Sequence, residues 1–260
     1  MYLTNWLQRI FSRTIPRRVR ATRLTTRRGR QRELAGSQRW LECLESRTLL
    51  TSDFGDAPDT GAGTGTGNYE TLLANGGPSH VIDTTQTTLF LGARVDGEAN
   101  ATQSGRANGD DTTTLPDDED GVIEPAQDLV LTVGTAPVVR VRATNATGSV
   151  ATLYGWIDIN RNGVFENATE RTSVTVPSGT NKGTFNLTVP TIAASTAAGA
   201  TYARFRLSTD LEAALPVGGA SDGEVEDYSA TIIKLSDSTA DSAKSKKIAS
   251  GTSSAPRLRT

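Results

Sequence analysis

After residue 127 the chain alternates short hydrophobic stretches with turn-forming residues, and this pattern predicts an all-β fold. In residues 138–145, valine and alanine alternate with arginine and threonine, which gives a strand one buried side and one solvent-facing side. Seven stretches read as strands: Leu129–Val133, Val138–Asn145, Leu153–Ile159, Ser173–Val176, Gly183–Val189, Thr201–Ser208 and Glu226–Lys234. Gly, Pro or Asn separates them, so we expect an antiparallel β-sandwich over residues 128–234.

The preceding segment, residues 53–127, is acidic and rich in turn residues. Only Val81–Ile82 and Thr87–Gly92 have the composition of strands, and Gly61–Gly67 reads as a flexible linker. Long stretches without regular structure are usually functional or disordered. We expect this segment to be partly ordered and to pack on the sandwich through its few apolar residues.

Residues 1–52 form a basic leader that ends in a sharp change of composition at Ser52–Asp53. Its first residues place apolar side chains on one helical face: Leu3, Trp6, Leu7, Ile10 and Phe11. An arginine-rich run follows without the apolar region of a standard secretory signal. The leader could direct the chain to the envelope, meet anionic membrane, bind nucleic acid non-specifically, or be a solvated arm without a partner.

Composition and charge narrow the classes of function. The 260 residues carry a net charge of −2, but residues 1–50 hold 12 Arg and 3 Glu, whereas residues 51–120 hold 13 acidic residues and 2 Arg. One Cys and one His exclude a disulfide framework and a zinc site built from several Cys or His. No apolar run is long enough for a transmembrane helix. Residues 235–260 have almost no apolar side chains, which predicts a disordered tail.

Two stretches of the predicted sandwich resemble a known family. Asp222–Tyr228 contains the string Gly-Glu-Val-Glu-Asp, and Trp156–Phe165 is similar to the pattern Trp-Ile-Asp-x-Asn-x-Asp-Gly-x-Phe. Together they resemble the GEVED domain over about residues 152–233. The resemblance implies a β-sandwich module of bacterial exported and surface proteins, often adhesin-like, with no defined ligand.

Segments outside these two stretches carry the resemblance further. Several short motifs look like the segment that commonly precedes the domain: Phe54–Asp59, Tyr69–Leu72, Gly77–His80, Leu91–Ala93 and Asp117–Val122. Leu44–Thr51 resembles the export leader Leu-Glu-Pro-Arg-x-Leu-Leu-Ser, with Ser46 in place of Pro and Thr51 in place of Ser. This resemblance implies export to the cell envelope or the exterior.

The most specific candidate for chemistry is a calcium site in residues 158–170. Oxygen ligands at positions 1, 3 and 5 and a Gly at position 6 are the pattern of a calcium-binding loop. The candidate ligands are Asp158, Asn160, Asn162, Val164 through its carbonyl, Glu166 and Glu170. The loop has no Glu at position 12 and follows a strand, so a weak site of extracellular type is expected. The competing interpretation is a bare turn at Asn162–Gly163.

Two acidic clusters are further candidates for binding a cation. The second cluster comprises Asp222, Glu224, Glu226 and Asp227, with Arg204 and Arg206 as expected cross-strand partners. Alternation along a strand places Asp227 on the face opposite to the other three carboxylates. The third cluster comprises Asp110–Asp111 and Asp117–Asp120. For both clusters the alternative is a set of solvated or ion-paired side chains without a metal.

Catalysis finds little support in the sequence, so we expect a non-enzyme with no catalytic residues. His80 is the single imidazole, and a structural role is favoured over that of a base. We expect an extracellular or envelope-associated structural or adhesive module that binds a protein or glycan, with Ca²⁺ as its one candidate cofactor. One alternative is a glycan-binding or hydrolase accessory domain with an aromatic platform of Trp156, Tyr154 and Tyr202, at least one of which should be buried. The other alternative is nucleic-acid binding by the basic arm, residues 9–32.

Overall fold

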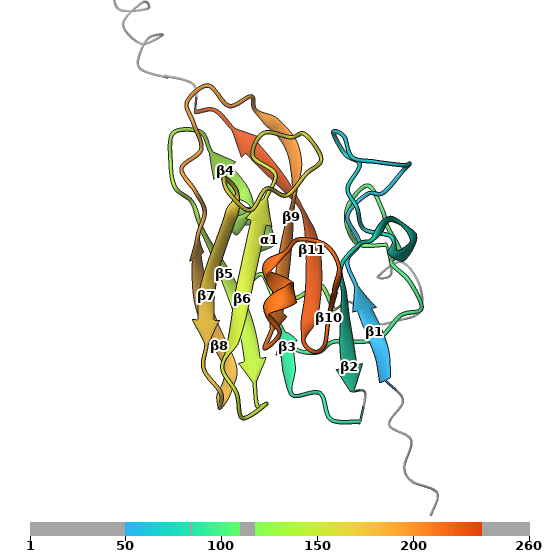
Figure 1. Ribbon diagram of the computed structural model, residues 1–260. Helices are drawn as coiled ribbons and strands as arrows, with labels where there is room; N and C mark the ends of the chain where they lie inside the picture. Colours follow the sequence, from blue (N-terminus) through green and yellow to red (C-terminus); the bar gives the residue numbers. More distant parts are fainter. Residues whose placement is uncertain (1–49, 84, 110–117, 236–260) are drawn as a thin grey trace, which may run out of the picture. The chain divides into compact units, whose positions relative to one another are not determined.

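The computed structural model describes residues 50–83, 85–109 and 118–235, and these residues form an all-β fold (Figure 1). The strands are β1 (Leu50–Phe54), β2 (Ser79–Asp83), β3 (Leu89–Leu91), β4 (Val130–Thr132), β5 (Val138–Asn145), β6 (Ala151–Ile157), β7 (Arg171–Val176), β8 (Thr180–Thr188), β9 (Gly199–Ser208), β10 (Gly219–Ala220) and β11 (Glu224–Ile233). The helical pieces are short: α1 (Pro125–Asp128), η1 (Leu73–Asn75) and η3 (Leu211–Ala214). Within these ranges no helix is long and apolar enough to cross a membrane. The basic leader up to residue 49, the acidic stretch 110–117 and the tail 236–260 lie outside the described residues.

Two sheets form the predicted sandwich. A five-stranded sheet runs in the order β4-β11-β9-β6-β7, and a three-stranded sheet runs in the order β3-β5-β8. Neighbouring strands in both are antiparallel except at one edge, where β4 is parallel to β11. Apolar side chains from both sheets form one core that includes Leu91, Val139, Val141, Leu153, Leu187, Phe205, Leu207 and Ile232. The β-sandwich is therefore confirmed, and its seven predicted strands correspond to β4–β9 and β11.

The upstream segment, residues 53–127, is built into the sandwich more closely than its composition predicts. Strand β3 pairs with β5 and so belongs to one of the two sandwich sheets. A third sheet has the order β1-β2-β10 and joins the upstream segment to the loop before β11 (Figure 1). Strand β1 includes Leu50, Thr51 and Ser52, which the sequence analysis assigned to the leader.

The five-stranded sheet is covered on both of its faces around β6, β9 and the first half of β11, whereas β7 exposes part of its outer face. A second core lies on the side away from β5 and contains Ala57, Tyr69, Tyr154, Trp156, Phe165, Ala213 and Ala220. Tyr69 of the upstream segment stacks on Phe165, with ring centroids 4.8 Å apart. The alternation of β9 would leave Arg204 and Arg206 facing water, but both are fully buried because this second layer covers them.

The glycine-rich run does not behave as the expected flexible linker. Gly65 and Asn68 pair through two backbone hydrogen bonds, and the Thr66 hydroxyl donates to the Arg161 carbonyl at 2.7 Å. Gly163 has φ = +82°, and a Cβ there would collide with the backbone of Gly65. The run therefore packs against the loop that holds the predicted calcium ligands.

Candidate functional site

A buried ion pair lies where the second core meets β9 and β11. Asp227 faces Arg204 across the two strands, and both side chains are inaccessible to solvent. Arg204 Nε donates to Asp227 Oδ1 at 2.7 Å, and Nη2 donates to Oδ2 at 2.8 Å. The remaining guanidinium hydrogens reach the Glu70 and Pro216 carbonyls and the Thr71 hydroxyl. A bidentate pair of this kind fixes both side chains and holds the upstream segment against the sheet.

Arg206 has a different partner from the carboxylate that the sequence suggests. Its Nε donates to His80 Nε2 at 2.9 Å, and its other nitrogens donate to the carbonyls of Leu215, Val217 and Gly218. His80 Nδ1 lies 2.6 Å from the Asp222 carbonyl oxygen, so the neutral imidazole donates there and accepts from Arg206. Burial, followed by the Arg206 charge, lowers the pKa of His80 well below its ordinary value. The sequence's single histidine thus joins β2, β9 and the loop before β11.

The predicted calcium ligands of residues 158–170 do come together in one loop. Asp158 Oδ2 accepts hydrogen bonds from the Gly163 amide at 2.9 Å and from the Tyr69 hydroxyl at 2.8 Å. Glu170 accepts from the amides of Ile159 at 2.7 Å and Glu166 at 3.0 Å. Burial is the main cause that raises the pKa of Glu170 to about 7. These two carboxylates therefore accept hydrogen bonds from backbone amides of the loop and hold its turn without an ion.

The outer rim of this loop is held by side-chain amides. Asn160 Nδ2 donates to Glu166 Oε2 at 2.6 Å, and Asn162 Nδ2 donates to Glu166 Oε1 at 2.7 Å. The Val164 amide donates to Asn162 Oδ1 at 2.8 Å, which closes a local turn. A cation at this rim would have to replace the two amide bonds to Glu166. The calcium interpretation stays a prediction, as does its alternative that the loop binds no ion.

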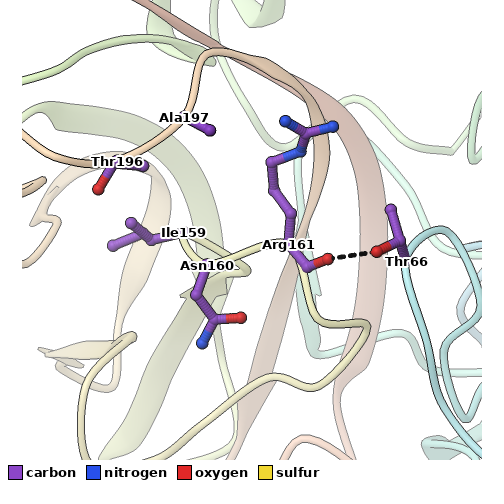
Figure 2. A pocket seen from close by; sticks show the side chains of 6 residues that line it. All are labelled: Thr66, Ile159, Asn160, Arg161, Thr196 and Ala197. Atoms are coloured by element: carbon purple, nitrogen blue, oxygen red, sulfur yellow. Dashed lines mark hydrogen bonds between the residues drawn. The ribbon is translucent and has the colours of Figure 1, made fainter.

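A polar hollow of about 400 Å³ lies beside this loop (Figure 2). Its lining comprises Thr66, Ile159, Asn160, Arg161, Thr196 and Ala197. Arg161 Nη1 donates to the Ala198 carbonyl at 3.0 Å, while its own carbonyl accepts from Thr66 (Figure 2). The lining mixes polar side chains with the apolar side chains of Ile159 and Ala197.

The structure divides the second acidic cluster among three places. Asp222 accepts from the hydroxyls of Ser208 and Thr209 and from the Thr209 amide. Asp227 pairs with Arg204 on the side of the second core. Glu224 and Glu226 point to the opposite face of β11, where both are fully buried. The four carboxylates therefore do not form one site.

Sequence reasoning missed a group of three carboxylates that come from separate parts of the upstream segment. One oxygen each from Asp53, Glu98 and Asp118 lie within 4.8 Å of one another. Asp53 and Asp118 are buried, and Glu98 is half-buried. Burial and neighbouring carboxylates raise the pKa values of Asp53, Glu224 and Glu226 well above their ordinary range. Asp118 belongs to the third acidic cluster, and its burial excludes a solvated side chain, one part of the alternative for that cluster, at this position.

Comparison with known protein families matches residues 152–231 to the GEVED domain. The chain contains a GEVED domain. The match begins inside β6 and ends inside β11, in agreement with the resemblance seen in the sequence. A search of curated proteins found no match. The similarity of residues 44–51 to an export leader stays a prediction.

The string that names the GEVED domain makes the contacts to the upstream segment. Every residue from Glu224 to Asp227 forms a hydrogen bond with it. Glu224 Oε2 accepts from the Leu91 amide, and the Val225 amide donates to Asp53 Oδ2 at 2.6 Å. Glu226 Oε1 accepts from Gly121 at 2.9 Å, and Asp227 Oδ2 accepts from Ala57 at 2.8 Å.

Alternation along β11 lets this short string bind in two directions. The side chains of Glu224 and Glu226 face the sandwich core, and that of Asp227 faces the second core. Gly223, which opens the string, has φ = +89°, and a Cβ there would collide with the Leu207 carbonyl. The string therefore has a structural role in this chain: it fastens the upstream segment to both faces of β11.

Proposed function

We propose that this protein is a non-catalytic β-sandwich module that acts outside the cell or in the cell envelope, as a structural or adhesive part. The structural use of its buried ionisable side chains carries this proposal. His80, Arg204 and Arg206 are all inaccessible to solvent and bind the layers of the fold to one another. A general base must reach the proton that it removes from the substrate, and His80 has no access to one. The sequence's resemblance to exported and surface proteins adds support for the location.

The outer face of the β3-β5-β8 sheet is the surface that we propose for a partner. On β8 it exposes Thr184, Asn186 and Thr188, while the residues between them point inward. Arg140 and Arg142 of β5 are half-buried beside this row, and Arg140 pairs with Glu124 and Asp128. Such a polar, hydrogen-bonding face suits a protein or glycan of a surface or matrix better than an apolar ligand.

The glycan-binding alternative needs a different surface from the one that the sequence suggested. Trp156 is fully buried, and Tyr154 is only 9% exposed. This confirms the expectation that at least one of the three aromatic candidates lies in the core. Tyr202 packs against the second core, and its hydroxyl donates to the Gly105 carbonyl. These rings therefore form no exposed platform for stacking on a sugar. Contact of the basic arm with anionic membrane or nucleic acid concerns residues outside the described ranges and remains a proposal.

Two measurements test the proposed function. Protease added to native cells with permeabilised outer envelope layers and an intact inner membrane should degrade the chain, because we place it outside the inner membrane. Recovery of the chain in the cytoplasmic fraction, protected from protease, would contradict the proposal. In a bead assay with matrix proteins and a glycan array, Thr184→Lys should weaken binding of the full chain. Thr175→Lys, at an exposed position of β7 in the other sandwich sheet, is the matched control and should leave binding unchanged.

The calcium loop is tested separately. If Asp158, Asn162 and Glu166 hold Ca²⁺ with extracellular-type affinity, Glu166→Gln should abolish a weak binding event in the millimolar range. An unchanged calorimetric titration of that variant would remove the loop as a calcium site.

A further inference from the structure

The hollow beside the loop of residues 158–170 contains an arginine whose charge the described residues do not balance. Arg161 lines this hollow and forms no ion pair within the described ranges. The bond from Nη1 to the Ala198 carbonyl at 3.0 Å is the only hydrogen bond of its guanidinium with a described residue. Its Nε is also shielded from water. A donor on a charged group is costly to leave unpaired, so this guanidinium calls for an acceptor.

The fold holds Arg161 in a conformation that few side chains adopt. Its φ is +62°, in the left-handed region, where residues other than glycine are uncommon. The Thr66 hydroxyl donates to the Arg161 carbonyl, and the guanidinium extends away from this contact, on the side of Ala197 (Figure 2). Gly199 leaves room for the guanidinium, since a Cβ there would lie 2.5 Å from Arg161 Nη1. Residues held in rare backbone conformations cluster at binding and catalytic sites.

The rest of the lining suits a compact polar ligand of negative charge. The volume of about 400 Å³ lies at the lower end of the range of small-molecule sites. The lining includes no acidic side chain. Thr196 is half-buried, and its hydroxyl forms no hydrogen bond with a described residue. The apolar side chains of Ile159 and Ala197 offer a small surface for the C–H face of a sugar ring.

We propose that this hollow binds the carboxylate of an acidic sugar, with Arg161 as the charged partner and Thr196 as a hydroxyl contact. A planar carboxylate can accept two parallel hydrogen bonds from the edge of a guanidinium, and Nε and Nη2 are the edge that the protein leaves unpaired. The site shares no residue with the proposed binding face on β8. It extends the proposed function by naming a class of glycan, but binding in solution does not depend on where the protein acts.

The test is binding of uronate trimers to the full chain, which is first stripped of metal with EDTA and then dialysed. Calorimetry at low salt should show binding of a trimer of galacturonate or of mannuronate. The methyl-esterified trimers lack the charge and should bind at least about tenfold more weakly. Arg161→Asn should weaken the affinity for the acidic trimer about tenfold to hundredfold, because the charge-assisted hydrogen bonds are lost. Asn adopts left-handed backbone more readily than most residues, so the fold should survive.

Lys182→Asn is the matched control. Lys182 is an exposed basic residue of β8 with φ = +51°, so this substitution removes the same charge from a similar backbone conformation elsewhere. It should leave the affinity for the trimer unchanged. Thr196→Val should weaken binding several-fold, since one neutral hydrogen bond is lost. Circular dichroism of each variant checks the fold.

The outcomes separate this site from its rivals. Loss of binding in Arg161→Asn with retention in Lys182→Asn supports the proposal. Absence of binding by both acidic trimers overturns it, as does equal weakening by the two substitutions, which would indicate attraction to basic residues in general. Binding that requires added Ca²⁺ also overturns it, because an ion then holds the carboxylate. Equal affinity for inorganic sulfate overturns the assignment to an acidic sugar. None of these results affects the protease test or the comparison of Thr184→Lys with its control.

Discussion

Asp227→Asn tests whether the last residue of the GEVED string stabilises the fold by pairing with Arg204. The substitution keeps the size of the side chain and one acceptor oxygen but removes the negative charge. Both partners are inaccessible to solvent, so the Arg204 guanidinium is left in the interior without a counter-charge. Removing one partner of a buried ion pair typically costs about 3–5 kcal/mol. We expect a loss near the lower limit, about 3 kcal/mol, because the carbonyls of Glu70 and Pro216 still accept from Arg204.

A loss of that size is large compared with the stability of an ordinary domain, about 5–15 kcal/mol. In a domain of this length it corresponds to a fall in melting temperature of roughly 6–12 °C. Urea unfolding of the full chain, followed by circular dichroism, should show a lower midpoint with an unchanged slope. The matched control is Glu124→Gln, which removes a charge from an exposed ion pair. The side chain of Glu124 is 45% accessible to solvent, and that of its partner Arg140 is 39% accessible. That change should cost less than about 1 kcal/mol. If the two substitutions cost the same, the buried pair does not stabilise the fold as we argue.

Three further predictions follow from the same contacts. Gly121→Ala should lower the free energy of unfolding in urea by about 1–3 kcal/mol, because the added Cβ would lie closer than 3.0 Å to Glu226. Gly61→Ala is the control: a Cβ at Gly61 meets open space, so the free energy of unfolding should not change. The pKa of His80 is lowered in the folded state, so its contribution to stability is present above the unfolded pKa of about 6.5. As the pH falls below that value, the contribution is lost by up to about 1.4 kcal/mol per pH unit. The difference in stability between the unmodified chain and His80→Gln, measured from pH 7.5 to 5, should show this slope, and parallel curves for the two proteins would refute the prediction. Residues 152–231 alone should give the circular dichroism of an unfolded chain, because they lack β3, β4 and β5. Residues 50–235 should instead melt cooperatively. A cooperative transition of the shorter chain would show that the upstream segment is dispensable.

The strands could be predicted from the sequence wherever their pattern is local. Strand β5 has the predicted bounds because valine and arginine alternate along it without interruption. Strands β1 and β10 were missed because neither shows an alternation, and each exists through pairing with β2, which is distant in sequence. The burial of Arg204 and Arg206 could not be predicted either. The sequence pattern of an alternating strand is the same whether its polar face meets water or a second layer of the fold.

The candidate site was harder to predict, for a geometric reason. Alternation along the strand separates Asp227 from Glu224 and Glu226, but it does not show which residues from distant parts of the chain lie beside them. Besides burial and the charge of Glu226, the charges of Asp53 and Asp118, more than 100 residues away along the chain, raise the pKa of Glu224. The excess of acidic residues in residues 51–120 is the signal that could have indicated them, and Asp118 already belongs to the third acidic cluster.

That acidic excess has a physical explanation in the contacts of the upstream segment. An irregular chain packed against a sheet leaves backbone amides that no strand or helix satisfies, and each needs an acceptor. Carboxylates fill this role: Asp56 accepts from the amides of Thr102 and Gly109. Asp59 likewise accepts from the amides of residues 71 and 72.

The glutamates and aspartate of the GEVED string do the same from the side of the sheet, where charge-assisted bonds are stronger than neutral ones. A segment with little regular structure can therefore be held on a sandwich by acidic side chains, provided that the remaining buried charge is balanced by a cation such as Arg204.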